Sequence, residues 1–356
     1  MPRALEILNR NKGEYDYLSP NDHVNASQSS NDTFPTASHI AIIKESDKLY
    51  TTLINLGGSF KLKGRKLSDT PKSGRAHLMD AMPVTLGDEF IAYGNAIIRA
   101  AKEIYEKRNN LLEVAIGGTA TGTGVNTLVS YRDNVVEKLA ELTSLDLVPA
   151  NDSLEALQSR SQISNFSGAL RELAHDLIRI SNDLRLMGSG PTSGFAEINL
   201  PPVQPGSSIM PGKFNPVMAE CLNMISFQII GNDTTVSLAA QAGQFELNVM
   251  TPVMTSNILD SISFLNNYLP IFQKRCVEGI TANKDRLRTI VEMNPIIATV
   301  LSPKIGYLKA AELVKKAMAG KESIRDIVVT QGILSEEEAD ELLDLKTISK
   351  NLYTKE

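Results

Sequence analysis

Apolar side chains recur at three- and four-residue spacing over several long stretches of this chain, and few glycines or prolines interrupt them. In one such stretch the apolar positions include Ile40, Ile43, Leu49 and Leu53. This period is that of an α-helix with one apolar stripe. The pattern predicts long helices over 36–66, 87–108, 154–187, 216–247 and 256–280. Long helices joined by short loops favour a mainly α fold built on an elongated helical bundle.

The pattern changes after about residue 284, where Pro295 and Pro303 interrupt the chain and short amphipathic segments follow. Ser335 and Glu338 have the spacing of a capping box, in which each side chain bonds the backbone N–H of the other residue at a helix start. We therefore predict a central helical-bundle domain over 36–284 and a small helical C-terminal domain over 285–356.

The composition limits the partners of the protein. The 36 Lys and Arg against 41 Asp and Glu give a net charge of −5, so no overall basic field attracts nucleic acid or an anionic membrane. Local positive groups must bind any anionic substrate. Two cysteines are too few for a disulfide framework, and the four histidines lack paired ligand spacing, so we expect no metal site. The first residues lack a signal-peptide pattern and no apolar run is long enough to span a membrane, so we expect a cytoplasmic protein.

The segment 206–216, Gly-Ser-Ser-Ile-Met-Pro-Gly-Lys-Phe-Asn-Pro, carries the densest set of reactive groups. Ser207 and Ser208 supply hydroxyls, and several backbone N–H groups of such a loop can point at one anion. Lys213 adds an ammonium and Asn215 an amide. These groups suit the removal of a proton from carbon beside a carboxylate, with stabilisation of the charge that results. The segment therefore predicts an elimination that makes or breaks a carbon–nitrogen or carbon–oxygen bond.

Two further segments carry candidate chemistry. Residues 19–36 are densely polar, with Pro35 just before the predicted helix, and helix N-termini bind anions through unpaired N–H groups. The alternative is a solvated loop with a helix cap. Further along, His77 lies between Arg75 and Asp80 in a stretch that we predict to be extended. A lone histidine is more often structural than catalytic, so both interpretations stay open.

Two glycine-rich strings lack the spacing of nucleotide-binding loops. Residues 117–124 match neither the dinucleotide pattern GxGxxG nor the phosphate-loop pattern GxxxxGK[ST]. In the segment 206–216, Phe214 follows the lysine where a phosphate loop requires Ser or Thr. We predict no nucleotide at either string.

Together, the three polar segments resemble signatures of the fumarase/aspartase superfamily. GSSIMPGKFNP is close to its most specific signature, and NDHVNASQSSNDTFPTA and GRAHLMDAMPVTLGDEF look like two others in the same order. The resemblance runs from Arg3 to the end of the chain. Four more stretches look more like the aspartase branch than the fumarase branch: KGEYDYLSPNDHVN, EINLPPVQPGSSIMP, GNDTTVSLAAQAGQFELNVMTPV and GITANK.

This resemblance implies an aspartase-like homotetramer with a central bundle of long helices. It also implies active sites shared between three subunits, a small dicarboxylate substrate and no cofactor. By resemblance, Ser207 is the general base that takes the proton beside the β-carboxylate of aspartate, which gives an enediolate. The other residues carried over from the family are Ser29, Ser30 and Ser208 for the enediolate, Lys213 and Asn215 for the second carboxylate, Asn31 near the amino group, and the catalytic pair of His77 and Glu220.

The chain departs from the family pattern at four positions. Ala76 stands where members usually carry Thr, and the missing hydroxyl is expected to lower the rate about ten- to hundredfold. Thr192 replaces a usual arginine, and Asn294 begins a segment that replaces a Ser-Ile-Gly-like turn. Ser19 stands where fumarases place a histidine, which favours the aspartase branch.

The sequence also begins after the family's first signature, a segment that contributes substrate-binding hydroxyls. Residues 1–35 are therefore expected to be a remnant of the N-terminal lyase domain, with part of the pocket and core left uncovered. Three alternatives stay open. They are an ammonia-lyase acting on aspartate, a fumarase that uses water in place of ammonia, and a lyase-fold protein that has lost catalysis and serves as a structural or interaction subunit.

Overall fold

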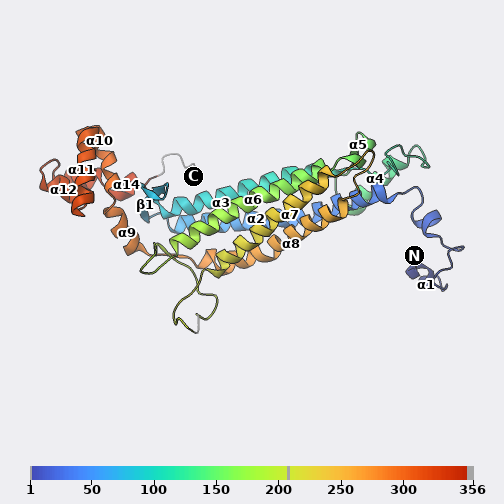
Figure 1. Cartoon of the computed structure of the whole chain (residues 1–356), viewed down its shortest axis with the longest axis horizontal. Helices are drawn as coiled ribbons and strands as arrows, with labels where there is room; N and C mark the ends of the chain where they lie inside the picture. Colours follow the sequence, from blue (N-terminus) through green and yellow to red (C-terminus); the bar gives the residue numbers. More distant parts are fainter. Residues whose placement is uncertain (1, 207–208, 351–356) are drawn as a thin grey trace. The chain divides into compact units, whose positions relative to one another are not determined.

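The computed structural model describes residues 2–206 and 209–350, which are mainly helical (Figure 1). The long helices are α2 (Ser30–Lys66), α3 (Leu86–Asn109), α6 (Ser161–Met187), α7 (Val217–Gln241) and α8 (Thr251–Arg275). The shorter α-helices are α1 (Pro2–Ile7), α4 (Tyr131–Thr143), α5 (Ser153–Gln158), α9 (Lys284–Glu292), α10 (Ser302–Ile305), α11 (Tyr307–Gly320), α12 (Ile324–Thr330), α13 (Glu336–Leu342) and α14 (Leu345–Ile348). The predicted mainly α fold is confirmed.

Short strands and tighter turns connect these helices. The strands pair as β1 (Pro71–Ala76) with β2 (Met79–Thr85) antiparallel, β3 (Glu113–Val114) with β4 (Val148–Pro149) parallel, and β5 (Ile198–Asn199) with β6 (Thr281–Ala282) antiparallel. A π-helix η1 (Pro20–Val24) precedes α2, and the 3₁₀ turns are η2 (Asn110–Leu112), η3 (Val277–Gly279) and η4 (Pro295–Leu301). None of the helices within the described residues is long and apolar enough to cross a lipid bilayer.

The chain divides into two compact units, and each long helix contributes residues to both. The first unit comprises Met1–Thr51, Ala100–His175 and Ile225–Asn267. The second comprises Thr52–Arg99, Asp176–Met224 and Tyr268–Glu356. The predicted domain boundaries at residues 36 and 285 stay predictions.

In the first unit, buried and half-buried polar side chains join neighbouring helices. Thr255 of α8 donates a hydrogen bond to Ser38 of α2 at 2.9 Å. Asp233 of α7 is almost fully buried and accepts a bond from Arg171 of α6 at 2.9 Å. Such bonds satisfy polar atoms that burial removes from water, while predicted apolar positions such as Ile43 fill the core.

In the second unit, glycines let α2 and α3 approach backbone to backbone. A Cβ added to Gly94 of α3 would lie 2.5 Å from the carbonyl oxygen of Gly57 in α2. At a second crossing point on the same two helices, a Cβ on Gly87 of α3 would lie 2.5 Å from the carbonyl oxygen of Gly64 in α2. Both distances are too short for any real Cβ, so larger residues would force these helices apart.

We expect Gly94→Ala to lower the free energy of unfolding by about 1–3 kcal/mol, because the new methyl group meets rigid backbone. Gly58 is the matched control, since it lies on α2 with no heavy atom within 4 Å of an added Cβ. There Gly58→Ala should stabilise the protein by up to about 1 kcal/mol through helix propensity. Urea unfolding of both variants checks the pair, and a stabilising Gly94→Ala would contradict the proposed close packing.

The predicted helix over 154–187 is interrupted, which the sequence pattern did not show. The chain leaves the helical conformation at Ser159, between α5 and α6. The adjacent Arg160 is buried, and its guanidinium donates to the carbonyl of Ala156 and to the hydroxyl of Thr251 at 3.0 Å. The break is thus stabilised by a contact 91 positions away in the sequence, which local periodicity does not reveal.

The predicted helix over 216–247 also ends too late. Asn248 is buried, and its side-chain amide donates at 3.0 Å to the carbonyls of Ala239 and Ala240. These carbonyls belong to the last turn of α7, where no intrahelical N–H is left to pair with them. The asparagine therefore caps α7, which ends at Gln241.

The C-terminal helices pack around their own apolar cluster, whose buried members include Leu301, Leu313 and Val328. The predicted capping box is confirmed at the start of α13. Ser335 Oγ accepts the Glu338 N–H at 3.1 Å, and Glu338 Oε2 accepts the Ser335 N–H at 3.0 Å.

Candidate functional site

Ser207 and Ser208, the predicted base and its neighbour, lie outside the described residues. The flanking loop leads into the N-terminus of α7. Lys213 and Asn215 are both exposed there, and the Asn215 carbonyl accepts the Val217 N–H at 2.8 Å. The predicted ammonium and amide are therefore open to a ligand, and their roles stay predictions.

Ser29, Ser30 and Asn31 lie at the N-terminus of α2, in the first unit. The helix begins at Ser30, so the prediction that Pro35 precedes the helix is wrong. Local bonds explain the earlier start, because Ser29 Oγ accepts the Asn31 N–H and Asp32 Oδ1 accepts the Ser29 N–H, each at 3.2 Å. These three consecutive predicted residues thus lie at the start of α2, where the helix dipole favours an anion although the Ser29 and Asn31 N–H groups already have partners.

Asp32 is a residue that the sequence pattern did not single out. Its side chain is fully buried and joins the start of α2 to the glycine-rich loop 117–124. Burial raises the pKa of this carboxyl, while hydrogen bonds from backbone N–H groups, those of Thr119 and Gly117 foremost, oppose that rise. Its position directly after the predicted Ser29-Ser30-Asn31 segment is the signal that could have identified it.

His77 lies at the exposed tip of the β1–β2 hairpin, in the second unit. It adopts a left-handed conformation with φ of 56°, as does Leu78 with φ of 61°, so the predicted extended conformation is wrong at this residue. Arg75 and Asp80 do lie on paired strands, opposite each other. Two successive positive φ values match the twist of a two-residue hairpin, which explains the turn.

Buried charges support this hairpin. Lys72 of β1 is 1% exposed, and its Nζ lies 2.9 Å from Glu89 Oε2 and 2.8 Å from Glu197 Oε2. Arg75 pairs with the other oxygen of Glu197 and lies over the ring of Phe195, 4.4 Å from its centroid. Burial raises the pKa of Glu89, against the opposing effect of Lys72. The network fixes the strand that ends one residue before His77.

Asn294, where the chain departs from the family pattern, adds a second anchor. It is buried, and its side-chain amide donates to the hydroxyl of Ser73 on β1 and to the carbonyl of Ala81 on β2. Its oxygen accepts the Ile296 N–H at 2.9 Å and caps η4. The asparagine thus ties the start of the C-terminal helices to the hairpin that carries His77.

Glu220, the predicted partner of His77, lies in the first turn of α7. Its side chain is 39% exposed, and its nearest cation is Arg185 at 4.0 Å. Within residues 2–206 and 209–350, no hydrogen bond or ion pair joins Glu220 to His77. Their pairing stays a prediction.

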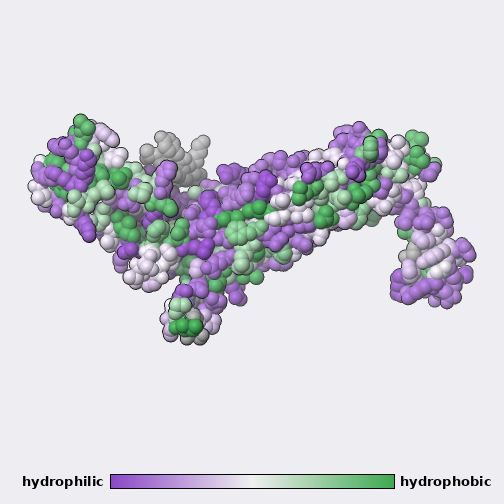
Figure 2. Space-filling model, viewed as in Figure 1, coloured by the Kyte–Doolittle hydropathy of each residue, from purple (hydrophilic) through white to green (hydrophobic). Residues whose placement is uncertain are grey.

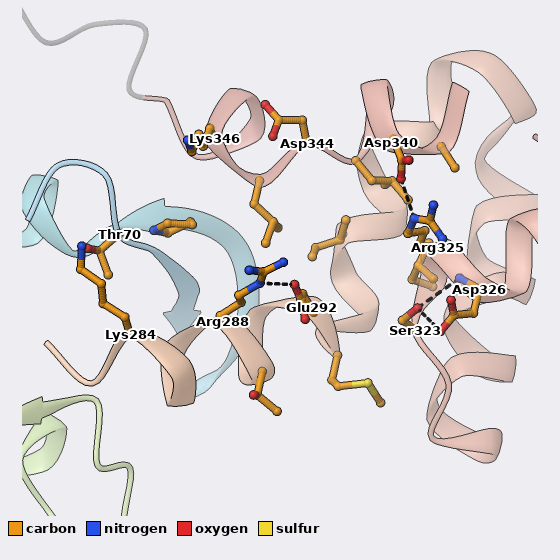
Figure 3. Close-up of a pocket in the computed structure, with 18 of the residues that line it drawn as sticks. Thr70, Lys284, Arg288, Glu292, Ser323, Arg325, Asp326, Asp340, Asp344 and Lys346 are labelled. Carbon is orange, nitrogen blue, oxygen red and sulfur yellow. Dashed lines mark hydrogen bonds and ion pairs between the residues drawn. The ribbon is translucent and has the colours of Figure 1, made fainter. Parts of the chain in front are cut away.

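A cavity of about 860 Å³ lies in the second unit, between α9, the start of β1 and the C-terminal helices (Figure 3). None of the predicted site residues lines it. Two of its cations are paired within the wall, Arg288 with Glu292 at 2.7 Å and Arg325 with Asp340 at 2.6 Å. The lining carries more carboxylates than cations, so its net negative charge disfavours a dicarboxylate and the cavity does not match the predicted substrate. The carboxylates are those of Asp69, Asp285, Glu292, Asp326, Asp340 and Asp344, against the cations Lys284, Arg288, Arg325 and Lys346.

The sequence is similar to those of known lyases. The sequence model of a family described as "Lyase" matches residues 3–231, and one described as "Fumarase C C-terminus" matches residues 297–350. An aspartate ammonia-lyase of Bacillus subtilis is 46% identical over 348 residues, which cover 98% of this chain and 73% of that protein. A class II fumarate hydratase of Brucella suis is 43% identical over 342 residues, which cover 96% of this chain and 74% of that protein.

Solved structures share the fold. A fumarate lyase:delta crystallin from Brucella melitensis, bound to cobalt, has a TM-score of 0.95 at 40% identity, covering 98% of this chain and 76% of that chain. A class II fumarase from Schistosoma mansoni has a TM-score of 0.93 at 34% identity, with 98% and 76% covered. The predicted fold class is confirmed by both matches.

Proposed function

The chain belongs to the fumarase/aspartase superfamily of lyases, and we propose that it is an aspartate ammonia-lyase that interconverts L-aspartate with fumarate and ammonia. Superfamily membership and the lyase class confirm two predictions from the sequence. The main observation in support of this proposal is the 46% identity with an aspartate ammonia-lyase over nearly the whole chain. The retained segment 206–216, with its two serines, lysine and asparagine, supports the same chemistry.

In this proposal Ser207 removes a proton from the carbon beside the β-carboxylate of aspartate. The electron pair moves onto that carboxylate and gives an enediolate with two negative charges. Hydroxyl and N–H donors around it, from Ser29, Ser30 and Ser208, stabilise the charge, which is the largest expected contribution to the rate. Lys213 and Asn215 hold the other carboxylate, and the amino group leaves as ammonia beside Asn31.

A serine hydroxyl is a weak acid, so the base needs help. The Lys213 ammonium and the backbone N–H groups of the loop would stabilise the serine alkoxide. His77, oriented by Glu220, would add a second charged group at the site. The hairpin turn exposes His77, so its imidazole is open to a ligand.

Fumarate hydratase activity is the second candidate. It is favoured by class II fumarate hydratases among the relatives, one of which, from Corynebacterium glutamicum, is 46% identical over 335 residues. Ser19 weighs against it. Its hydroxyl accepts the N–H groups of Asn21 and Asp22 and caps η1, at a position where fumarases place a histidine.

The two activities separate in one assay. We expect the purified protein to form fumarate, followed by its ultraviolet absorbance, together with an equal amount of ammonia when L-aspartate is supplied. L-Malate should give no fumarate above the blank. Fumarate from malate alone would establish the hydratase, and no product from either substrate would establish a lyase-fold protein without catalysis.

We further propose that the protein works as a cytoplasmic homotetramer. Apolar side chains reach the surface along the long helices, as the hydropathy colouring shows (Figure 2). On α7, Met224 is 62% and Phe227 57% exposed. Burial of such faces between subunits would stabilise an assembly. Both cysteines, Cys221 and Cys276, are free, which fits a reducing compartment.

A further inference from the structure

The loop 117–124, which matches no nucleotide motif, is bonded to the start of α2 by one buried carboxylate. Asp32 Oδ2 accepts the N–H of Gly117 at 3.0 Å and that of Thr119 at 2.9 Å. Its other oxygen accepts the Ser29 N–H at 3.2 Å. The fully buried Asp32 side chain thus links Ser29, a predicted substrate-binding residue, to a loop that is distant in sequence.

This loop needs such support because its backbone is strained. Thr119 has φ of 57°, a left-handed conformation that a β-branched residue rarely adopts, and Gly117 has φ of 95°. Thr119 is also 6% exposed, and its hydroxyl has no hydrogen-bond partner among the described residues. Strain and an unsatisfied buried polar atom are typical of a functional site that neighbouring contacts hold in place.

The same loop sets the orientation of Asn31. Asn31 Nδ2 lies 2.8 Å from the carbonyl oxygen of Ala120. Only the NH₂ end of an amide donates to a carbonyl, so this contact identifies which end faces the loop. The Asn31 Oδ1 remains as an acceptor, and no hydrogen bond reaches it within the described part of the chain.

We propose that Asp32 is a positioning residue of the substrate site, which fixes Ser29 and the loop so that Asn31 presents its amide oxygen to the amino group of the substrate. The inference rests on the proposed ammonia-lyase function. An amide oxygen accepts an N–H of the amino group, and it holds that group in line for departure. Asp32 itself touches no substrate and acts through its three backbone bonds.

Asp32→Asn tests this role with little change of shape. The variant amide has one oxygen to accept bonds, and its NH₂ end would face an N–H donor, so at least one of the three bonds is lost. We expect kcat/KM for L-aspartate to fall about ten- to hundredfold, as for a lost bond to a charged group. The matched control is Asp233→Asn, in the same unit, whose equally buried carboxylate binds Ser167 and Arg171 of α6.

The control should unfold at a lower temperature yet keep kcat/KM of the folded protein within about twofold, because its contacts join two helices. Asp32→Asn with wild-type kcat/KM would overturn the proposal. The proposal would also be overturned if kcat/KM fell in both variants in proportion to the drop in their melting temperatures. A purely structural role of Asp32 predicts that result.

Amide hydrogen exchange gives a readout that requires no turnover. In Asp32→Asn, the Ser29, Gly117 and Thr119 amides should exchange at least about tenfold faster than in wild type, and unchanged exchange would refute the role. If Asp32→Asn does not fold, amide exchange of the wild type is compared with and without succinate. Slower exchange at Gly117 and Thr119 supports the coupling, and no change contradicts it. A wild type inactive on aspartate would refute only the proposed function, because the exchange comparison stands without it.

Discussion

Replacement of Ser207 by alanine is expected to lower kcat for L-aspartate by about 10²–10⁴-fold, the usual contribution of a general base. No other hydroxyl is assigned to the proton transfer in the proposed mechanism. Lys213 and Asn215 still bind the substrate in the variant, so KM should change far less than kcat. Steady-state kinetics with L-aspartate measures both.

Ser208→Ala is the matched control for this prediction. It removes a neighbouring hydroxyl that we assign to the enediolate as one of several donors, so we expect a smaller loss of about tenfold, as for one hydrogen bond. Neither variant should change the assembled mass, which light scattering should find at four times 38.8 kDa. A Ser207→Ala enzyme with near wild-type kcat would exclude the serine as the base.

Replacement of Lys72 by methionine is expected to destabilise the protein by about 3–5 kcal/mol, the usual cost of removing one partner of a buried ion pair. Lys72 is the cation between Glu89 and the fully buried Glu197. Without it, two carboxylates face each other with only Arg75 to compensate. Urea unfolding measures the change, and the β1–β2 hairpin with His77 should lose its order first.

Lys284→Met is the matched control, since it makes the same substitution in an exposed pair with Asp69 at 3.4 Å. Exposed pairs contribute little, so we expect a change within about 1 kcal/mol. Adding Glu197→Gln to Lys72→Met should recover part of the loss, because it removes a fully buried carboxylate that has lost Lys72 as its partner. Equal effects of Lys72→Met and Lys284→Met would contradict the assigned role of the network.

The long helices were predictable because their apolar stripes are local and repeat over many turns. The exceptions arise from polar side-chain contacts that an apolar pattern does not record. Arg160 reaches Thr251 and stabilises a break between two helices, and Asn248 caps α7 from beyond its end. The contact of Arg160 spans 91 positions and forms only after the helices pack, while the cap depends on a single polar side chain beyond the periodic stretch.

The candidate site was defined from the sequence as a set of segments, because their residue types and order match a family, and the roles of its residues stay predictions. The supports of the site were not. Asp32 meets Thr119 across 87 positions, and Arg75 meets Glu197 across 122. In the sequence alone, nothing distinguishes Asp32 or Arg75 from other charged residues. The conformation of His77 was also missed, since His-Leu lacks the Asn-Gly chemistry that usually marks a turn of positive φ.

A crystal structure of the protein in its assembled state with bound succinate tests the central claim most directly. We predict that Ser207 Oγ lies about 3–3.5 Å from a methylene carbon of the diacid, the distance of a reactive arrangement, with Lys213 and Asn215 on the far carboxylate. A diacid bound with Ser207 out of reach of its carbon, whichever subunit supplies the serine, would contradict the account.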